Sequence, residues 1–426
     1  MRPFEGVKIL DCTHVLAGPF AAYQLAVLGA DVIKVEDPNE PDQSRQSGAD
    51  HALNKAGMGT SFLTQGSNKR SIALDLKTAA GRDALKRLAK DWADVFVENY
   101  RPGAFKALGL GYEDLSKSNP KLVYASMTAF GQDGPRGNQT AYDHAIQATS
   151  GITATTGTEA SGPIKVGAPV IDYATGTTGA FAIAAALYQT LRTGRGQYID
   201  MAMLDVALIL QASHVVDYFN NGHATRRAGN RMRFAESSMQ QASDGLVQLA
   251  ASNPRQHKRF YDAIDEPAEA ARNGFEERYT RYDEKQATIA GKLKEKTAQE
   301  WEDYFQARHV PATRVRELRE ALHDPQLEYR RVLHRHENVP GVGKPVTVPL
   351  TAFKFAHDGA SIERPPATLG QHTDEVLAAV GYSAEEIEAM RESGAEAYRR
   401  RAATINTKRS FVPLRVLRGL KLCSLS

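Results

Sequence analysis

A β-α-β pattern in the first 36 residues limits the folds open to this chain more than any other feature. Residues 7–11 have the composition of a short buried strand, and residues 14–19 that of a turn. Residues 20–28 carry apolar side chains at helical spacing, and residues 31–36 form a second apolar strand. Two strands joined by one helix pair in parallel. The pattern therefore predicts an α/β protein with a Rossmann-like parallel sheet.

Four later segments extend the predicted sheet. Residues 68–77, 94–98, 121–127 and 197–203 all have the composition of strands. Polar loops rich in glycine and proline follow several of them, as at residues 99–103 and 130–135. Open α/β sheets bind ligands at the carboxyl ends of their strands. We therefore expect these loops to form one ligand-binding crevice.

The first turn argues against a nicotinamide cofactor. Glu36 ends the second strand, where dinucleotide-binding folds place a ribose-binding acid. The turn at residues 14–19, however, offers one glycine, a proline and the bulky Leu16 instead of a glycine-rich fingerprint. The sequence therefore predicts a Rossmann-like fold without NAD binding.

Changes in composition divide the chain into four predicted parts. Residues 1–220 form the first part of a large Rossmann-like domain, in which residues 38–66 are an irregular excursion or lid. Residues 221–330 form a smaller α+β domain with a basic loop (226–233), a strand at 246–251 and charged helices at 254–272 and 282–309. Residues 331–397 return to complete the large domain. Residues 398–426 form a basic tail that we expect to be disordered.

Charge and cysteine content exclude several functional classes. The net charge of +3 comes from the tail, which holds eight Lys/Arg and no acid, while the rest holds 45 basic and 50 acidic residues. Nothing there predicts a nucleic-acid surface. Two cysteines, Cys12 and Cys423, cannot build a disulfide framework, and neither has metal-ligand spacing. With no secretory segment and no run of 18 apolar residues, we expect a cytoplasmic protein that binds no membrane.

Asp172 is the clearest candidate for chemistry. It follows an apolar run and Pro169, and the helix-like run 178–191 comes after it. The start of a helix favours negative charge, so a carboxylate there can be a nucleophile, a helix cap or an ion-pair partner. The residues alone leave these three interpretations open. His144, a lone histidine upstream, is more often structural than catalytic.

Eight stretches together resemble the class III CoA-transferase family (CaiB/BaiF), typified by formyl-CoA and carnitine CoA-transferases. The likeness runs from about residue 4 to residue 393. Each stretch is a weak signal alone, but their order and spacing are specific. They are residues 14–19, 29–36, 68–72, 94–103, 131–135, 193–197, 323–325 and 370–375.

The resemblance implies a CoA-transferase that moves CoA from an acyl-CoA to a small carboxylic acid. It places the family's nucleophilic aspartate at Asp172, which needs no metal and no permanently bound cofactor. It also implies an interlocked homodimer. The contacts to the CoA substrate that it implies are Leu16, Ala17, Leu74, Asp75, Leu76, Lys77, Asn99, Tyr100, Arg101, Thr140, Ala141, Tyr142 and Asp143.

Several positions depart from the formyl-CoA transferase pattern. Leu16 replaces a glutamine, and Asp37, Ala107 and Thr140 stand where that enzyme has basic contacts to CoA. Formyl-CoA transferase also has a mobile glycine-rich loop, and this loop has no counterpart near residues 229–245 of this chain. These changes count against formyl or oxalyl substrates. Arg101 and Lys106 are candidates for the missing cations, and the arginines of loop 226–233 are candidates for recognising a dicarboxylate.

Two other functions remain open at this stage. The α-methylacyl-CoA racemases of the family use a histidine and an aspartate, but Tyr142 occupies the histidine position and His144 lies two residues later. A tyrosine is a poor base at neutral pH, which favours the transferase. A non-catalytic CoA-binding protein is the third possibility.

The expected chemistry assigns further roles. An aspartate ionised at neutral pH attacks without a base. Backbone amides near Ala17 or Gly176 are expected to stabilise the developing negative charge. Lys69, Arg70, Lys77 and Arg101 are the predicted cations for the CoA phosphates.

Overall fold

The computed structural model describes residues 1–272 and 274–395, so the predicted tail lies outside the described residues. A six-stranded parallel sheet forms its centre, in the order β3-β2-β1-β4-β5-β8. This is the strand order of doubly wound nucleotide-binding folds. The predicted Rossmann-like α/β fold is confirmed. The strands are β1 Lys8–Cys12, β2 Asp31–Glu36, β3 Lys69–Ala73, β4 Val95–Glu98, β5 Val123–Thr128 and β8 Gln197–Ala202.

Successive residues of each strand supply two separate cores. Ile9, Val32 and Val95 pack under helices α1 (Ala17–Val27) and α9 (Val170–Thr193). Their neighbours Leu10 and Ile33 pack with Phe96 on the opposite face. Side chains alternate across a pleated strand, so a strand buried on both faces must be apolar throughout. This explains the continuous apolar runs of the sequence.

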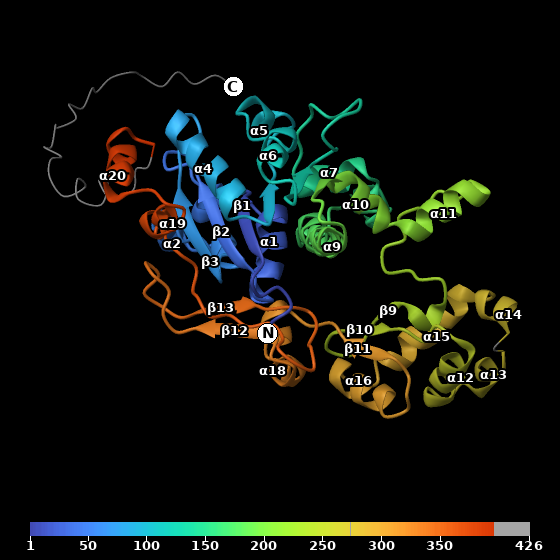
Figure 1. Ribbon diagram of the computed structural model, residues 1–426. Coiled ribbons are helices and arrows are strands. Elements are labelled where there is room, and N and C mark those ends of the chain that lie inside the picture. The colour runs from blue at the N-terminus through green and yellow to red at the C-terminus, as the bar shows by residue number, and fades with distance from the viewer. Residues whose placement is uncertain (273, 396–426) are drawn as a thin grey trace, which may run out of the picture.

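The C-terminal segment covers the second face of the sheet. Helix α4 (Ala79–Asp91) lies there with α19 (Thr373–Ala379) and α20 (Ala384–Glu392), as Figure 1 shows. Val376, Leu377 and Ile387 join the same core as Leu85 and Leu88 of α4. The last described helices therefore complete a core that begins at β1. The predicted boundaries at residues 220 and 330 stay predictions.

A smaller unit is built around an antiparallel sheet in the order β11-β10-β9, with its own core. Each predicted charged helix is divided in two. Pro267 and the left-handed Asp265 interrupt the first, and a capping box of Thr297 with Glu300 starts a new helix inside the second. The elements are β9 Met239–Gln241, β10 Leu246–Leu249, β11 Ala312–Arg314, α12 Pro254–Ala263, α13 Pro267–Ala271, α14 Phe275–Tyr279, α15 Tyr282–Leu293 and α16 Ala298–Gln306.

Some of the remaining elements join the strands of the large sheet, and others lie between the two units or after the smaller one along the chain. Helix α11 extends away from the large unit in Figure 1, and β12 pairs with β13 in a separate antiparallel ribbon. The bounds are α5 Ala104–Ala107, α6 Tyr112–Ser118, α7 Asp143–Thr149, α8 Ile152–Thr155, β6 Gly157–Thr158, β7 Gly162–Pro163, α10 Met203–Ile209, α11 Ala212–Asn221, η2 Ala235–Ser237, α17 Leu318–Ala321, α18 Pro325–Arg330, β12 Leu333–His336 and β13 Val346–Pro349.

Helix α9 is long and apolar enough to cross a membrane by length and composition alone. Its contacts are those of a core helix. A side chain at Gly179 would lie 2.4 Å from the Met127 side chain of β5, and the helix buries Ile183 against the sheet.

The excursion at residues 38–66 is not irregular, contrary to expectation. It contains the 3-10 helix η1 (Gln43–Gln46) and helices α2 (His51–Lys55) and α3 (Thr60–Leu63). Two buried ion pairs attach it to the sheet: Arg45 to Glu36 (2.7 Å) and Asp42 to Lys34 (2.9 Å). Because buried charges must be paired, these contacts fix the excursion over the carboxyl edge of the sheet.

Asp11 and Lys69 form a third buried ion pair, with Nζ 2.8 Å from Oδ2. Replacing Asp11 with Asn leaves the buried Lys69 without its counter-charge. We expect the free energy of unfolding to fall by about 3–5 kcal/mol in urea titrations. The control is Glu113→Gln, which breaks the exposed pair of Glu113 with Lys106 and should cost less than about 1 kcal/mol. Equal losses of unfolding free energy in the two variants would contradict the assignment of Asp11 and Lys69 as a buried ion pair.

Candidate active site

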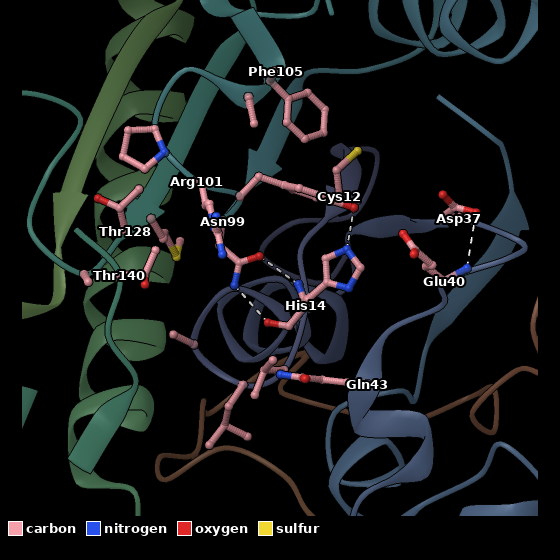
Figure 2. A pocket seen from close by; sticks show the side chains of 18 of the residues that line it. Cys12, His14, Asp37, Glu40, Gln43, Asn99, Arg101, Phe105, Thr128 and Thr140 are labelled. Atoms are coloured by element: carbon pink, nitrogen blue, oxygen red, sulfur yellow. Dashed lines mark hydrogen bonds between the residues drawn. The ribbon is translucent and has the colours of Figure 1, made fainter. Parts of the chain in front are cut away.

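A cavity of about 840 Å³ opens at the carboxyl edge of the parallel sheet. The ends of β1, β2 and β5 line it through Cys12, Glu36 and Thr128. The loops after β3 and β4 add Leu74 and Asn99 (Figure 2). The crevice predicted from the polar loops after the strands is therefore present.

Most of the predicted site residues meet in this one cavity. Those that line it are Leu16, Ala17, Leu74, Leu76, Lys77, Asn99, Tyr100, Arg101, Thr140, Ala141, Tyr142 and Asp172. Asp75 and Asp143 are not among the lining residues. The Asp75 carboxylate accepts the backbone N–H of Lys77, so it shapes the loop after β3.

Asp172 lies in the first turn of α9, at the point where this helix meets the start of α1. Gly176 is one turn further on and therefore on the same side of the helix. A side chain at Gly176 would lie 2.7 Å from the backbone oxygen of Ala17, so only glycine permits the close approach. Phe20 and Tyr173 stack edge to face across the same contact. The small residues after Asp172 thus bring its carboxylate to the N-terminus of α1.

Asp143 occupies the N-terminus of α9. Its Oδ2 accepts the backbone N–H groups of Ile171 (2.7 Å) and Asp172 (3.1 Å), and its Oδ1 accepts from Gln147. Of the three interpretations of Asp172, the helix cap therefore belongs to Asp143. A second carboxylate so close disfavours another negative charge.

Asp172 is a weaker acid than the sequence analysis predicted. Burial and the charge of Asp143 raise the pKa of Asp172 to about 7. The prediction that this carboxylate is fully ionised at neutral pH is therefore wrong for the unliganded protein. Near pH 7 the protonated and ionised forms coexist.

The N-terminus of α1, in contrast, keeps free amides. The N–H groups of Ala17 and Gly18 have no hydrogen-bond partner within the described part of the chain, and Leu16 provides no side-chain cap. Pro19 has no N–H. The helix thus presents two donors, and its dipole favours negative charge, at the edge of the cavity.

His14 is a lining residue that the sequence analysis did not assign. Its ring hydrogen-bonds the hydroxyl of Tyr100, and burial lowers the pKa of His14, so the ring is neutral at pH 7. The Asn99 side chain binds both backbone polar groups of His14. Asn99 Oδ1 accepts from the His14 N–H, and Asn99 Nδ2 donates to the His14 oxygen, each at 2.8 Å (Figure 2). Only the position of His14 in the first turn, directly after a strand, could have indicated it.

Two of the four predicted phosphate cations line the cavity. Arg101 is one, and Lys77 is the other, with its Nζ 3.4 Å from Asp37 and 3.2 Å from Glu40. The prediction for Lys69 and Arg70 is wrong. They are the first two residues of β3, where Arg70 pairs with Asp31, and the buried Lys69 side chain pairs with Asp11 near the carboxyl end of β1.

Other candidates lie away from the cavity. Lys106 pairs with Glu113, and Arg231 of the basic loop pairs with Asp283. Arg227 donates to the backbone oxygen of Ala154. His144 is exposed and does not line the cavity, so it is not placed to act as the histidine partner of Asp172 that a racemase would need. Among the described residues, no cluster of His, Cys, Asp and Glu could hold a metal ion.

Comparisons with known proteins identify the family of this chain. The model of CoA-transferase family III matches residues 4–373. Human succinyl-CoA:glutarate CoA-transferase is 33% identical over 381 residues, which cover 88% of this chain and 86% of the relative. Acetyl-CoA:oxalate CoA-transferase of Acetobacter aceti is 35% identical over 351 residues, or 81% of this chain and 89% of the relative.

Solved structures show the same fold. The hypothetical protein Rv3272 of Mycobacterium tuberculosis superposes with a TM-score of 0.78 at 31% identity, covering 88% of this chain and 99% of that one. A CaiB/BaiF family protein from Brucella suis gives a TM-score of 0.76 at 29% identity, with 89% and 99% covered. The match across most of the sequence and the cavity at the carboxyl edge lead to one conclusion: this chain is an enzyme that transfers CoA and belongs to CoA-transferase family III.

Proposed function

We propose that Asp172 is the nucleophile of this CoA-transferase and carries CoA as an aspartyl thioester between two carboxylic acids. One observation carries the proposal: Asp172 lines a single cavity together with the strand-end loops and with Ala17, the first residue of α1. The family resemblance assigns the same role to this position. A carboxylate needs no metal and no redox cofactor for this reaction.

The first half of the reaction begins with attack by an oxygen of Asp172 on the thioester carbonyl of the acyl-CoA. The carbon–sulfur bond breaks, CoA leaves as a thiolate, and a mixed anhydride forms. The thiolate then attacks the Asp172 carbonyl carbon of the anhydride. This step breaks the anhydride bond, releases the donor acid as a carboxylate and leaves an aspartyl-CoA thioester.

The second half runs the same steps in reverse with the acceptor. The acceptor carboxylate attacks the aspartyl-CoA carbonyl, CoA thiolate leaves, and a new mixed anhydride forms. Attack of the thiolate on the acceptor's carbonyl gives the new acyl-CoA and restores the Asp172 carboxylate. No electrons are transferred to or from an outside reagent, and no proton is consumed.

The amides of Ala17 and Gly18 are the donors that we assign to the developing oxyanion. Both are free within the described structure, and they stand at the positive end of the α1 dipole, beside the cavity. Prearranged amides stabilise charge that appears only in the transition state.

Arg101 and Lys77 are the cations that we assign to the CoA phosphates, with Lys77 exchanging Asp37 and Glu40 for phosphate.

The names of the relatives suggest the substrates. They act on succinyl-CoA with glutarate and on acetyl-CoA with oxalate. We therefore propose a short acyl-CoA such as succinyl-CoA as donor and a dicarboxylic acid as acceptor. The expected cytoplasmic location is part of this proposal.

We also propose the interlocked homodimer that the resemblance implies. Apolar side chains stand exposed along α9, α10 and α11, including Phe181 (74% exposed), Ile209 (75%) and Phe219 (81%). Exposed apolar surface of this kind is typical of an interface.

Sedimentation equilibrium is expected to give twice the mass of the chain at micromolar concentration, and a monomer under these conditions would contradict the proposal.

Covalent capture tests the nucleophile. The protein is mixed with succinyl-CoA, treated with borohydride, and digested for peptide mass spectrometry. Reduction of an aspartyl thioester should change the mass of the peptide that contains Asp172, because the side-chain carbonyl becomes an alcohol.

The Asp172→Ala variant should show no such change. Asp205→Ala is the matched control, because Asp205 is also an acid in the first turn of a helix but is exposed and outside the cavity. It should be captured like the parent. A parent that transfers CoA without an adduct on the Asp172 peptide would refute the covalent mechanism.

The pH dependence of capture tests the raised pKa. Only the ionised carboxylate attacks, and the pKa of Asp172 is about 7 in the unliganded protein. The single-turnover rate of thioester formation should therefore fall about tenfold per pH unit well below pH 7 and level off above about pH 8. CoA affinity measured at each pH separates binding from chemistry. A rate that stays constant from pH 5 to pH 8 would contradict the assigned pKa.

A further inference from the structure

Val15, directly before the start of α1, has an unusual backbone conformation. Its φ is 68°, in the left-handed region. A β-branched residue rarely adopts this region because its side chain crowds the backbone. Such a conformation persists only where surrounding contacts enforce it, and it is often found at functional sites. The question is what holds Val15 and what its conformation achieves.

Side chains from distant segments bind the backbone of the whole turn. Lys34 donates to the Thr13 oxygen at 2.7 Å, and Asn99 holds both backbone groups of His14. At Val15, the N–H donates to Asp42 Oδ1 at 3.0 Å, and the oxygen accepts from Gln65 Nε2. Every backbone polar group from the Thr13 oxygen to the Val15 oxygen thus has a side-chain partner.

The two residues that hold Val15 come from the two ends of the excursion at residues 38–66. Asp42 is 1% exposed, and its second oxygen lies 2.9 Å from Lys34 Nζ. Gln65 is 2% exposed. Both side chains are therefore fixed in the interior and cannot easily follow a change in the turn. The excursion holds Val15 from its N–H and from its oxygen at once.

The conformation of Val15 decides the direction in which α1 begins. Leu16 follows as the residue before the helix, and the free amides of Ala17 and Gly18 come next. A right-handed Val15 would turn these residues relative to β1, which fixes the chain on the other side. The left-handed Val15 thus sets where α1 begins beside the cavity, which Leu16 and Ala17 line.

We propose that Asp42 and Gln65 are positioning residues, which hold Val15 in the left-handed conformation and so keep the amides of α1 in place for the oxyanion. This inference rests on the proposed function of Asp172 and α1. It assigns to the excursion a role in the reaction other than covering the cavity, and neither residue needs to touch the substrate.

The test is a double-mutant cycle between Asp42 and Val15. Asp42→Ala removes the acceptor of the Val15 N–H and should slow thioester formation from succinyl-CoA by about 10- to 100-fold in single turnovers, as expected for weakened oxyanion stabilisation. The dissociation constant of CoA should change less than about threefold, because ground-state contacts remain. In the Val15→Gly background the same Asp42→Ala change should cost less than about threefold, because glycine adopts positive φ without support.

A second variant covers the case in which Asp42→Ala does not fold. Gln65→Leu keeps the volume of the side chain but removes its donor, and should show the same loss and the same rescue by Val15→Gly. Asp50→Asn is the matched control, because Asp50 caps α2 on the same excursion without touching the turn. Its rate should equal that of the parent.

Two results would overturn the inference. One is a folded Asp42→Ala or Gln65→Leu variant that reacts at the parent's rate. The other is a loss that Val15→Gly does not reduce, since a general structural role would give the same loss in both backgrounds. A parent without any adduct on Asp172 would instead overturn the proposed function and with it the premise of this inference.

Discussion

The buried charges at the carboxyl edge of the sheet are the constraint on which the rest of the site depends. Asp11, Lys34 and Lys69 lie inside a parallel sheet whose two faces are covered by apolar layers. Leaving any of these charges unpaired would be costly, so their partners must be held at hydrogen-bonding distance. For Lys34 the partner is Asp42, which the excursion provides. The need to neutralise a strand residue thus fixes a segment that shapes the cavity.

The two helices that meet at the cavity use their N-termini in opposite ways. Asp143 accepts the first amides of α9, and its charge helps to raise the pKa of the neighbouring Asp172 to about 7. No side chain caps α1, so its dipole and its free amides act on the cavity. One terminus thus orients the proposed nucleophile, while the other remains free for the charge that the proposed reaction would develop. Exchanging these roles would give a strongly acidic aspartate and no oxyanion donors.

The sequence predicted those features that depend on local patterns. Strand β2 has the predicted bounds Asp31–Glu36, because burial on both faces of the sheet favours apolar residues at consecutive positions. Asp172 was recognisable from its place before an apolar helix and from the family resemblance. Pairings between distant residues were not predictable in this way. Lys69 looked like a phosphate ligand because its partner Asp11 is 58 residues away, and Asp143 caps α9 from a different helix. The left-handed Val15 depends on Asp42 and Gln65, so no local pattern indicates it.

The raised pKa of Asp172 also bears on the direction of the proposed reaction. The mixed anhydride has two carbonyl carbons, and the CoA thiolate can attack either. Attack at the aspartyl carbon expels the substrate acid, whose pKa is ordinarily about 4. Attack at the substrate carbon expels Asp172, whose pKa is about 7 in the unliganded protein. The weaker base leaves faster, so the thiolate should attack the aspartyl carbon more often and form mainly the aspartyl-CoA thioester. In the proposed mechanism, burial beside Asp143 therefore slows both steps that expel Asp172, namely the return to the original acyl-CoA and the formation of the new one. It also leaves a nucleophile that is only partly ionised at neutral pH.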